Sequence, residues 1–232
     1  MTQPSLLDRR RFLLGAAPAV AIGSLGVGAC ARNNGHADPL RYSPTYFSAA
    51  EWVFINAAVC RLIPAEGAGP GGVQAGVPEF IDRQMELPYG YGAYFYMKGP
   101  FRSDSPATLG YQLRYSPREI YRLGIAAVNA TTQASQGKVF AQLTPVEQDS
   151  FLVGMETGDV HFPSVPAPVF FGQLLGNSKE GYFADPLYGG NRGMLAWQWI
   201  GFPGARADFT DWIDQAGRVY PYGPVSISGA RA

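Results

Sequence analysis

The chain has 232 residues, with 18 basic and 18 acidic side chains, so its formal net charge is zero. No basic stripe runs along it, which excludes the usual nucleic-acid-binding surface. Charged residues make up only 16% of the chain and aromatic residues 13%. This balance predicts that another molecule covers part of the folded surface. Alternatively, the aromatic side chains pack the protein's own long loops.

The first 30 residues have the pattern of an export signal. Arg9 and Arg10 precede Phe12 and Leu13, and an apolar stretch then continues to Ala29. This is the pattern of a twin-arginine signal, which typically exports proteins that fold before they cross the inner membrane. The stretch is shorter and less hydrophobic than a membrane-spanning helix. We therefore predict a periplasmic protein that is associated with the inner membrane.

The end of this signal fits two processing reactions. Residues 27–30 resemble a lipobox, in which Cys30 would carry a lipid, but residues 29–31 also fit ordinary signal peptidase. Either cleavage removes three arginines and one aspartate and leaves 15 basic against 17 acidic residues. Residues 31–44 are polar and suit a tether. If Cys30 is lipidated or lost, no internal disulfide is possible, and Cys60 is expected to be a small buried hydrophobe.

Three strong helices are predicted from their first residues. Each starts at a Ser or Thr followed three positions later by Glu, the pattern of a capping box. They begin at Ser48, Ser116 and Thr144, and end near Pro64, Gly137 and Gly158. Shorter helices are expected at 78–86 and 167–176, with two more at 178–180 and 191–200. No segment alternates like a strand, so residues 45–232 are predicted to form one mainly α, single-domain helical bundle.

The predicted loops are long and rich in Gly, Pro and Tyr. Residues 64–77 are Gly- and Pro-rich, residues 88–101 alternate Tyr with Gly, and residues 219–232 show no helical pattern. Ordered loops of this length in a compact domain are usually functional or lie on a partner.

No residues of this chain are predicted to be catalytic, cofactor-binding or metal-binding. Histidine occurs only twice, and no cysteine pattern for haem, iron–sulfur or zinc is present. The glycines of residues 67–72 match a dinucleotide-binding spacing. However, a predicted helix precedes them, and Pro70 lacks the N–H that a phosphate cradle would use. The carboxylates of Glu79, Asp82 and Glu86 are expected to form a solvated face.

Two aromatic segments, residues 88–101 and 182–202, are predicted to form a partner interface, because Tyr, Trp and Arg dominate interface energetics. The residues chosen are Tyr89, Tyr91, Tyr94, Phe95, Tyr96, Tyr182, Phe183, Asp185, Tyr188, Asn191, Arg192 and Trp197. The alternative is a loop that packs on its own protein, with Arg192 paired to Asp185 or to a backbone carbonyl.

Several motifs resemble the gluconate 2-dehydrogenase subunit 3 family. They span most of the chain in order: AVCRLIP at 58–64, GVPEFIDRQ at 76–84, YMKGPF at 96–101, EGYFADPLYGGNR at 180–192 and IGFPG at 200–204. The resemblance implies the small subunit of a membrane-bound, FAD-dependent sugar or polyol dehydrogenase complex. FAD would then belong to a catalytic partner subunit and haem c to a multihaem cytochrome c subunit.

The resemblance also implies that this chain performs no chemistry itself and carries the twin-arginine signal for the flavin subunit. Membrane association would be direct, through a lipid, or would come through the complex. Two other functions stay open from the sequence: a stand-alone periplasmic enzyme, and a lipid-anchored structural protein of the envelope.

Overall fold

The computed structural model describes residues 42–67, 69–102, 105–110 and 112–232. Within these ranges the chain forms α-helices, short 3-10 turns and isolated β-bridges, and no β-strand. The α-helices are α1 (Ala49–Leu62), α2 (Val77–Met85), α3 (Pro117–Gln136), α4 (Pro145–Thr157), α5 (Ala167–Phe183) and α6 (Leu195–Ile200). The predicted mainly α fold is confirmed. The signal residues Arg9, Arg10, Phe12 and Leu13, and Cys30, lie outside the described residues.

The capping boxes start three of the helices as predicted. At α1 the Ser48 backbone N–H donates to the Glu51 carboxylate at 2.9 Å, and at α4 the Thr144 N–H donates to Glu147 at 2.7 Å. The same bond at Ser116 of α3 is 2.7 Å. These bonds satisfy backbone donors that have no partner within a helix. The left-handed glycines at the ends of α3 and α4 also stand where the sequence places them.

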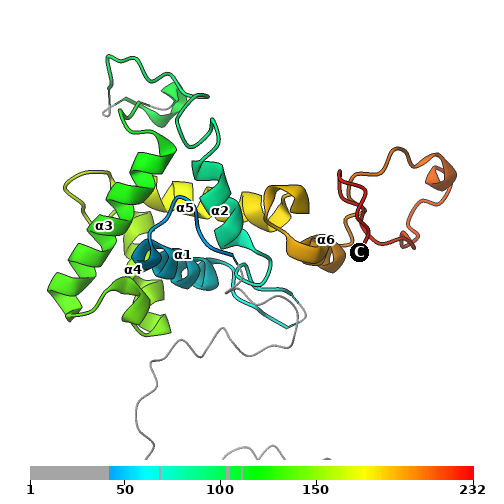
Figure 1. Ribbon diagram of the computed structural model, residues 1–232, viewed down its shortest axis with the longest axis horizontal. Coiled ribbons are helices and arrows are strands. Elements are labelled where there is room, and N and C mark those ends of the chain that lie inside the picture. The colour runs from blue at the N-terminus through cyan, green and yellow to red at the C-terminus, as the bar shows by residue number, and fades with distance from the viewer. Residues whose placement is uncertain (1–41, 68, 103–104, 111) are drawn as a thin grey trace, which may run out of the picture.

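Helix α5 is the centre of the bundle, and it packs against α1, α2, α3, α4 and α6 (Figure 1). Aromatic rings fill the space around it. Phe170 of α5 lies edge-on to Tyr121 of α3 at 5.9 Å between ring centroids, and Phe54 of α1 meets Phe140 at 5.1 Å. All four side chains are almost fully buried. Burial of such rings is the main source of stability in a helical body of this kind.

One helix prediction is wrong in its boundaries, because α5 runs without a break through residues 177–180. The sequence predicted one helix at 167–176 and a separate one at 178–180. In the structure, the Ser178 hydroxyl donates to the Leu174 carbonyl at 2.7 Å, and Asn177 accepts the Tyr121 hydroxyl at 3.1 Å. Tertiary partners therefore satisfy both polar side chains inside the helix.

The start of the folded body is fixed by one buried carboxylate. Asp82 of α2 is fully buried, so the prediction that it lies on a solvated face is wrong. Its oxygens accept hydrogen bonds from the Tyr42 hydroxyl at 2.8 Å and from the backbone N–H groups of Thr45, Tyr46 and Phe47 at 2.7–3.1 Å. Charge-assisted bonds of this number offset the desolvation of a buried carboxylate.

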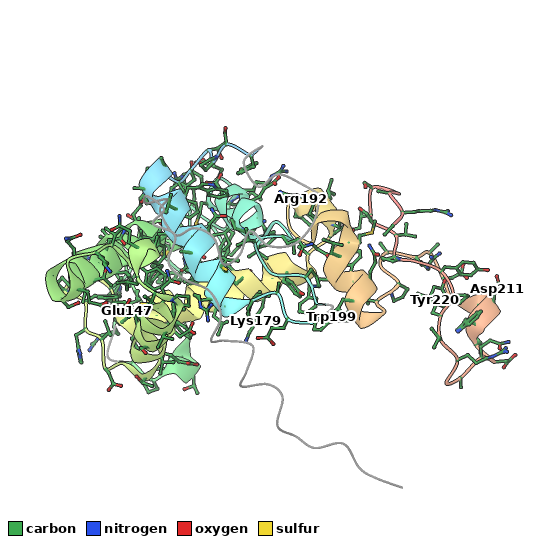
Figure 2. The ribbon with its side chains drawn as sticks, turned by 90° about the horizontal axis from the view of Figure 1, so that it is seen from below. Glu147, Lys179, Arg192, Trp199, Asp211 and Tyr220 are labelled. Atoms are coloured by element: carbon green, nitrogen blue, oxygen red, sulfur yellow. The ribbon has the colours of Figure 1, made fainter. Side chains whose placement is uncertain are left out.

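Residues 203–232 form a C-terminal arm that projects away from the helices (Figure 1). Its far end, with Asp211 and Tyr220, lies well beyond α6 (Figure 2). The arm is closed near its base, where the Ala205 N–H donates to the Val225 carbonyl at 2.7 Å. Arg206 lies over the rings of Tyr220 and Tyr222. The arm therefore has internal contacts but contributes little to the central core.

Cys60 of α1 is only partly buried, whereas the sequence predicted a small buried hydrophobe. Along the part of the chain that the structure describes, no helix combines the length and the apolar character needed to cross a membrane.

Candidate partner interface

The first predicted interface segment, residues 88–101, has an inner and an outer set of side chains. Tyr89 and Phe95 are half-buried, and their ring centroids lie 6.2 Å apart. The Tyr89 hydroxyl accepts a hydrogen bond from Asn177 Nδ2 at 3.0 Å, and burial raises the pKa of Tyr89. In contrast, the side chains of Tyr91, Tyr94 and Tyr96 are 58–74% exposed. Only this outer set is available to another molecule.

The second predicted segment is a turn that joins α5 to α6 and is braced by Glu79 of α2. The two Glu79 oxygens accept bonds from Arg83 at 2.5 Å and from Arg192 at 2.7 Å. Arg192 thus pairs with Glu79, not with Asp185 or a carbonyl as the self-packing alternative expected. Its backbone N–H also donates to the Ala75 carbonyl at 2.8 Å. The turn is therefore tied to α2 and to the loop before it.

Asp185 is buried and ties this turn to the C-terminal arm. It accepts bonds from the Ser226 hydroxyl at 2.6 Å, the Ile227 N–H at 2.7 Å and the Leu187 N–H at 3.0 Å. Burial by itself would raise the pKa of Asp185, but these three bonds together outweigh burial and hold the pKa below its ordinary value. Asp185 is thus bonded to the C-terminal arm and to the turn itself, while Arg192 pairs with Glu79.

Three other predicted interface residues are also buried and support the turn from inside. Tyr182 donates its hydroxyl to the Pro70 carbonyl at 2.7 Å, and the Trp197 indole N–H donates to the Phe183 carbonyl at 2.9 Å. Asn191 is fully buried, and its side-chain oxygen accepts the Ala196 N–H at 2.9 Å. These side chains position the turn, and none of them faces the surface.

The backbone of this turn is unusual. Asn191 and Met194 have φ values of 41° and 56°, and they are the non-glycine residues with positive φ among the described residues. Between α5 and the turn, a Cβ at Gly190 would lie 2.1 Å from the Gly181 carbonyl oxygen, so only glycine fits. The helix predicted at 191–200 consequently begins only at Leu195, after a 3-10 turn. Such conformations persist where surrounding contacts over-determine them, and they cluster at functional sites.

Large apolar side chains are nevertheless exposed along residues 183–202, hereafter the braced segment. Two of them, Phe183 and Tyr188, were predicted as interface residues, and they are 45% and 46% exposed. Leu187, Trp199, Ile200 and Phe202, which lie in the same predicted segment, are 44–55% exposed. In the view of Figure 2, Arg192 and Trp199 lie on opposite sides of this segment. Hydrophobic side chains gathered on a rigid surface typically mark an interaction site.

No group of three or more His, Cys, Asp or Glu side chains suited to a metal ion is found among the described residues. The site consists of exposed apolar and aromatic side chains on a backbone that buried polar side chains hold in place. Hot spots of protein interfaces have this combination of aromatic anchors and rigid support.

Comparison with protein families gives a match over most of the chain. The model of the family described as gluconate 2-dehydrogenase subunit 3 matches residues 49–204, which is about two thirds of the chain. This range begins at α1 and ends just after α6, so it covers all the α-helices and both predicted interface segments. None of the curated proteins and none of the solved structures matches the chain. The chain belongs to the gluconate 2-dehydrogenase subunit 3 family.

Proposed function

We propose that this chain is the non-catalytic small subunit of a periplasmic, membrane-bound, FAD-dependent sugar or polyol dehydrogenase complex of the gluconate type. It binds and stabilises the flavin-bearing catalytic subunit and carries it through twin-arginine export. FAD and haem c belong to the partner subunits, the catalytic subunit and a multihaem cytochrome c. The complex is associated with the inner membrane, either through a lipid on Cys30 or through its other subunits.

Family membership supports the role as a subunit, and one structural observation supports the contact with a partner. This observation is the braced segment 183–202, where six large apolar side chains are 44–55% exposed while Asp185, Asn191 and Trp197 of the same segment are buried. A soluble protein rarely gathers so many exposed apolar groups without a use. Because the turn is already fixed by Glu79 and Asp185, binding requires little ordering of the backbone.

We expect Tyr188→Ala to weaken association with the flavin-bearing subunit by about 2 kcal/mol, because a half-exposed aromatic anchor is lost from the interface. The variant should melt close to the wild-type temperature, since nearly half of Tyr188 is already exposed in the isolated chain. The measurement is titration of the purified flavoprotein with each small-subunit variant, beside circular-dichroism melts.

Tyr222→Ala is the matched control, because Tyr222 is an aromatic residue with 63% exposure that lies in the C-terminal arm. It should leave the affinity unchanged. If Tyr188→Ala lowers the melting temperature while the affinity per folded molecule holds, the segment packs only on its own protein. The proposed interface would then be wrong.

A further inference from the structure

The C-terminal arm has a tip and a return segment that differ in burial. Within residues 205–223, all of which the structure describes, no residue is buried. The chain then turns back, and its C-terminus lies near α6 at the base of the arm (Figure 1). In this return segment Pro224 and Ser226 are buried. Residues 224–228, hereafter the strap, are therefore packed against other parts of the chain, whereas the tip is not.

The strap is bonded at both ends of the braced segment. Near the start of that segment, buried Asp185 accepts the Ser226 hydroxyl at 2.6 Å and the Ile227 N–H at 2.7 Å. Just past the end of the segment, the Ala205 N–H donates to the Val225 carbonyl at 2.7 Å. The strap therefore joins the start of the braced segment to the residues that follow its end.

The second of these contacts is too close for a side chain. A Cβ at Gly204 would lie 2.2 Å from the Val225 carbonyl oxygen and 3.0 Å from the Trp197 ring, and the φ of Gly204 is 74°. Glycine is therefore required at this position. The Trp197 indole N–H in turn donates to the Phe183 carbonyl, so the strap is continuous with the buried support of the braced segment.

The end of the chain folds back on the strap and satisfies its backbone. The Ser226 N–H donates to the Ala230 carbonyl at 2.8 Å, and the Ala232 N–H donates to the Pro224 carbonyl at 3.2 Å. These bonds hold the strap itself in one conformation. The family match ends at residue 204, so the strap is a feature of this chain beyond the matched range.

From these contacts we propose that the strap holds the braced segment in the shape that binds the flavin-bearing subunit, an inference that rests on the proposed function. Without the strap, the Leu187 N–H would be the one remaining hydrogen-bond donor to Asp185. A buried carboxylate with so few donors turns toward water, and the turn that carries Leu187 and Tyr188 would move with it. The partner would then have to order this turn on binding, which lowers the affinity.

The test compares two substitutions at one position of the strap. Ile227→Pro removes the N–H that donates to Asp185, whereas Ile227→Ala removes only a side chain that is 62% exposed. In Ile227→Pro, the Leu187 amide should exchange its hydrogen about tenfold faster, and the affinity for the purified flavin-bearing subunit should fall about tenfold. Ile227→Ala should match the wild type in both measurements. Ser226→Ala, which loses the 2.6 Å bond, should shift both in the same direction as Ile227→Pro.

Hydrogen exchange is measured by mass spectrometry on the chain alone, and affinity by titration, beside circular-dichroism melts. Unchanged exchange at Leu187 in Ile227→Pro and Ser226→Ala would overturn the inference. So would faster exchange or a lower melting temperature with no loss of affinity per folded molecule, because the strap would then be merely structural. A wild-type chain that protects Leu187 but does not bind the flavoprotein would overturn the proposed function, and this inference with it. Full binding by Ile227→Pro would overturn this inference alone.

Discussion

At the residue scale, two buried aspartates show how single carboxylates hold chain segments that have no regular structure. Asp82 holds residues 42–47 against α2, and Asp185 holds the C-terminal arm against the turn after α5. In both cases the carboxylate accepts backbone N–H groups that lack partners within a helix or a sheet. These bonds are charge-assisted and are therefore stronger than bonds between neutral groups.

We expect Asp185→Asn to loosen the arm, because an amide replaces a carboxylate that accepts three hydrogen bonds. The loss of charge-assisted bonding is about 2 kcal/mol, so the Ile227 amide should exchange its hydrogen about 30-fold faster than in the wild type. Hydrogen exchange followed by mass spectrometry measures this directly. Asp208→Asn is the control, since Asp208 is exposed and bonds only Thr210 beside it. Equal exchange at Ile227 in the wild type and Asp185→Asn would contradict the role of Asp185.

The same carboxylate gives the attachment of the arm a defined dependence on pH. The pKa of Asp185 is lowered in the folded state, so its contribution is fully present above the ordinary aspartate pKa of about 4. It declines as the pH falls below this value and is lost as the pH falls through the folded pKa. Protection of the Ile227 amide in the wild type should follow this course, and Asp185→Asn should remove this pH dependence.

At the element scale, the packing of α3 on α5 depends on the absence of a side chain at Gly124. A Cβ at this position would lie 2.4 Å from the Phe170 ring. We therefore expect Gly124→Ala to lower the free energy of unfolding by about 2 kcal/mol, since the strain of overpacking exceeds the gain in helix propensity. Urea denaturation followed by circular dichroism measures the change.

Gly172→Ala on α5 is the matched control. A Cβ at Gly172 meets no atom within 4 Å, so this change should stabilise the protein by about 0.5–1 kcal/mol. If both variants shift stability in the same direction, close contact between α3 and α5 does not explain the need for glycine at position 124.

At the scale of the whole molecule, the proposed carrier role predicts that export of two proteins depends on one signal. We expect Arg9→Lys combined with Arg10→Lys to keep both this chain and its flavin-bearing partner in the cytoplasm, because the pair of arginines is required for the twin-arginine route. The measurement is fractionation of cells into cytoplasm, periplasm and inner membrane, with detection of both proteins.

A variant with Lys138→Ala, which leaves the signal unchanged, should export both proteins normally. Arrival of the partner in the periplasm at wild-type levels despite the double substitution would show that it has a route of its own. The same fractionation tests the proposed inner-membrane association, which predicts that both wild-type proteins are recovered with the membrane.

The sequence by itself determined the helices α1, α3 and α4, and it indicated the family. Capping boxes, N-terminal prolines and terminal glycines are local signals, and they placed α1, α3 and α4 with accurate ends because the bonds involved span only a few residues. The motifs between residues 58 and 204 indicated the family that the matched model confirms. The aromatic content also indicated where both exposed segments lie, because Tyr and Trp residues at predicted turns can be recognised in the sequence.

Tertiary structure alone decided which of those aromatic and polar residues face outward. Tyr182 and Tyr188 lie six positions apart in the same motif, yet one is buried and the other is half-exposed. Asp82 and Glu79 share a helix, but Asp82 meets residues 42–47 while Glu79 meets Arg192, more than 100 positions away. Exposure and pairing of this kind depend on contacts between distant segments. A local pattern cannot specify them, because the same residue types occur both as buried groups that support a turn and as exposed groups on a binding surface.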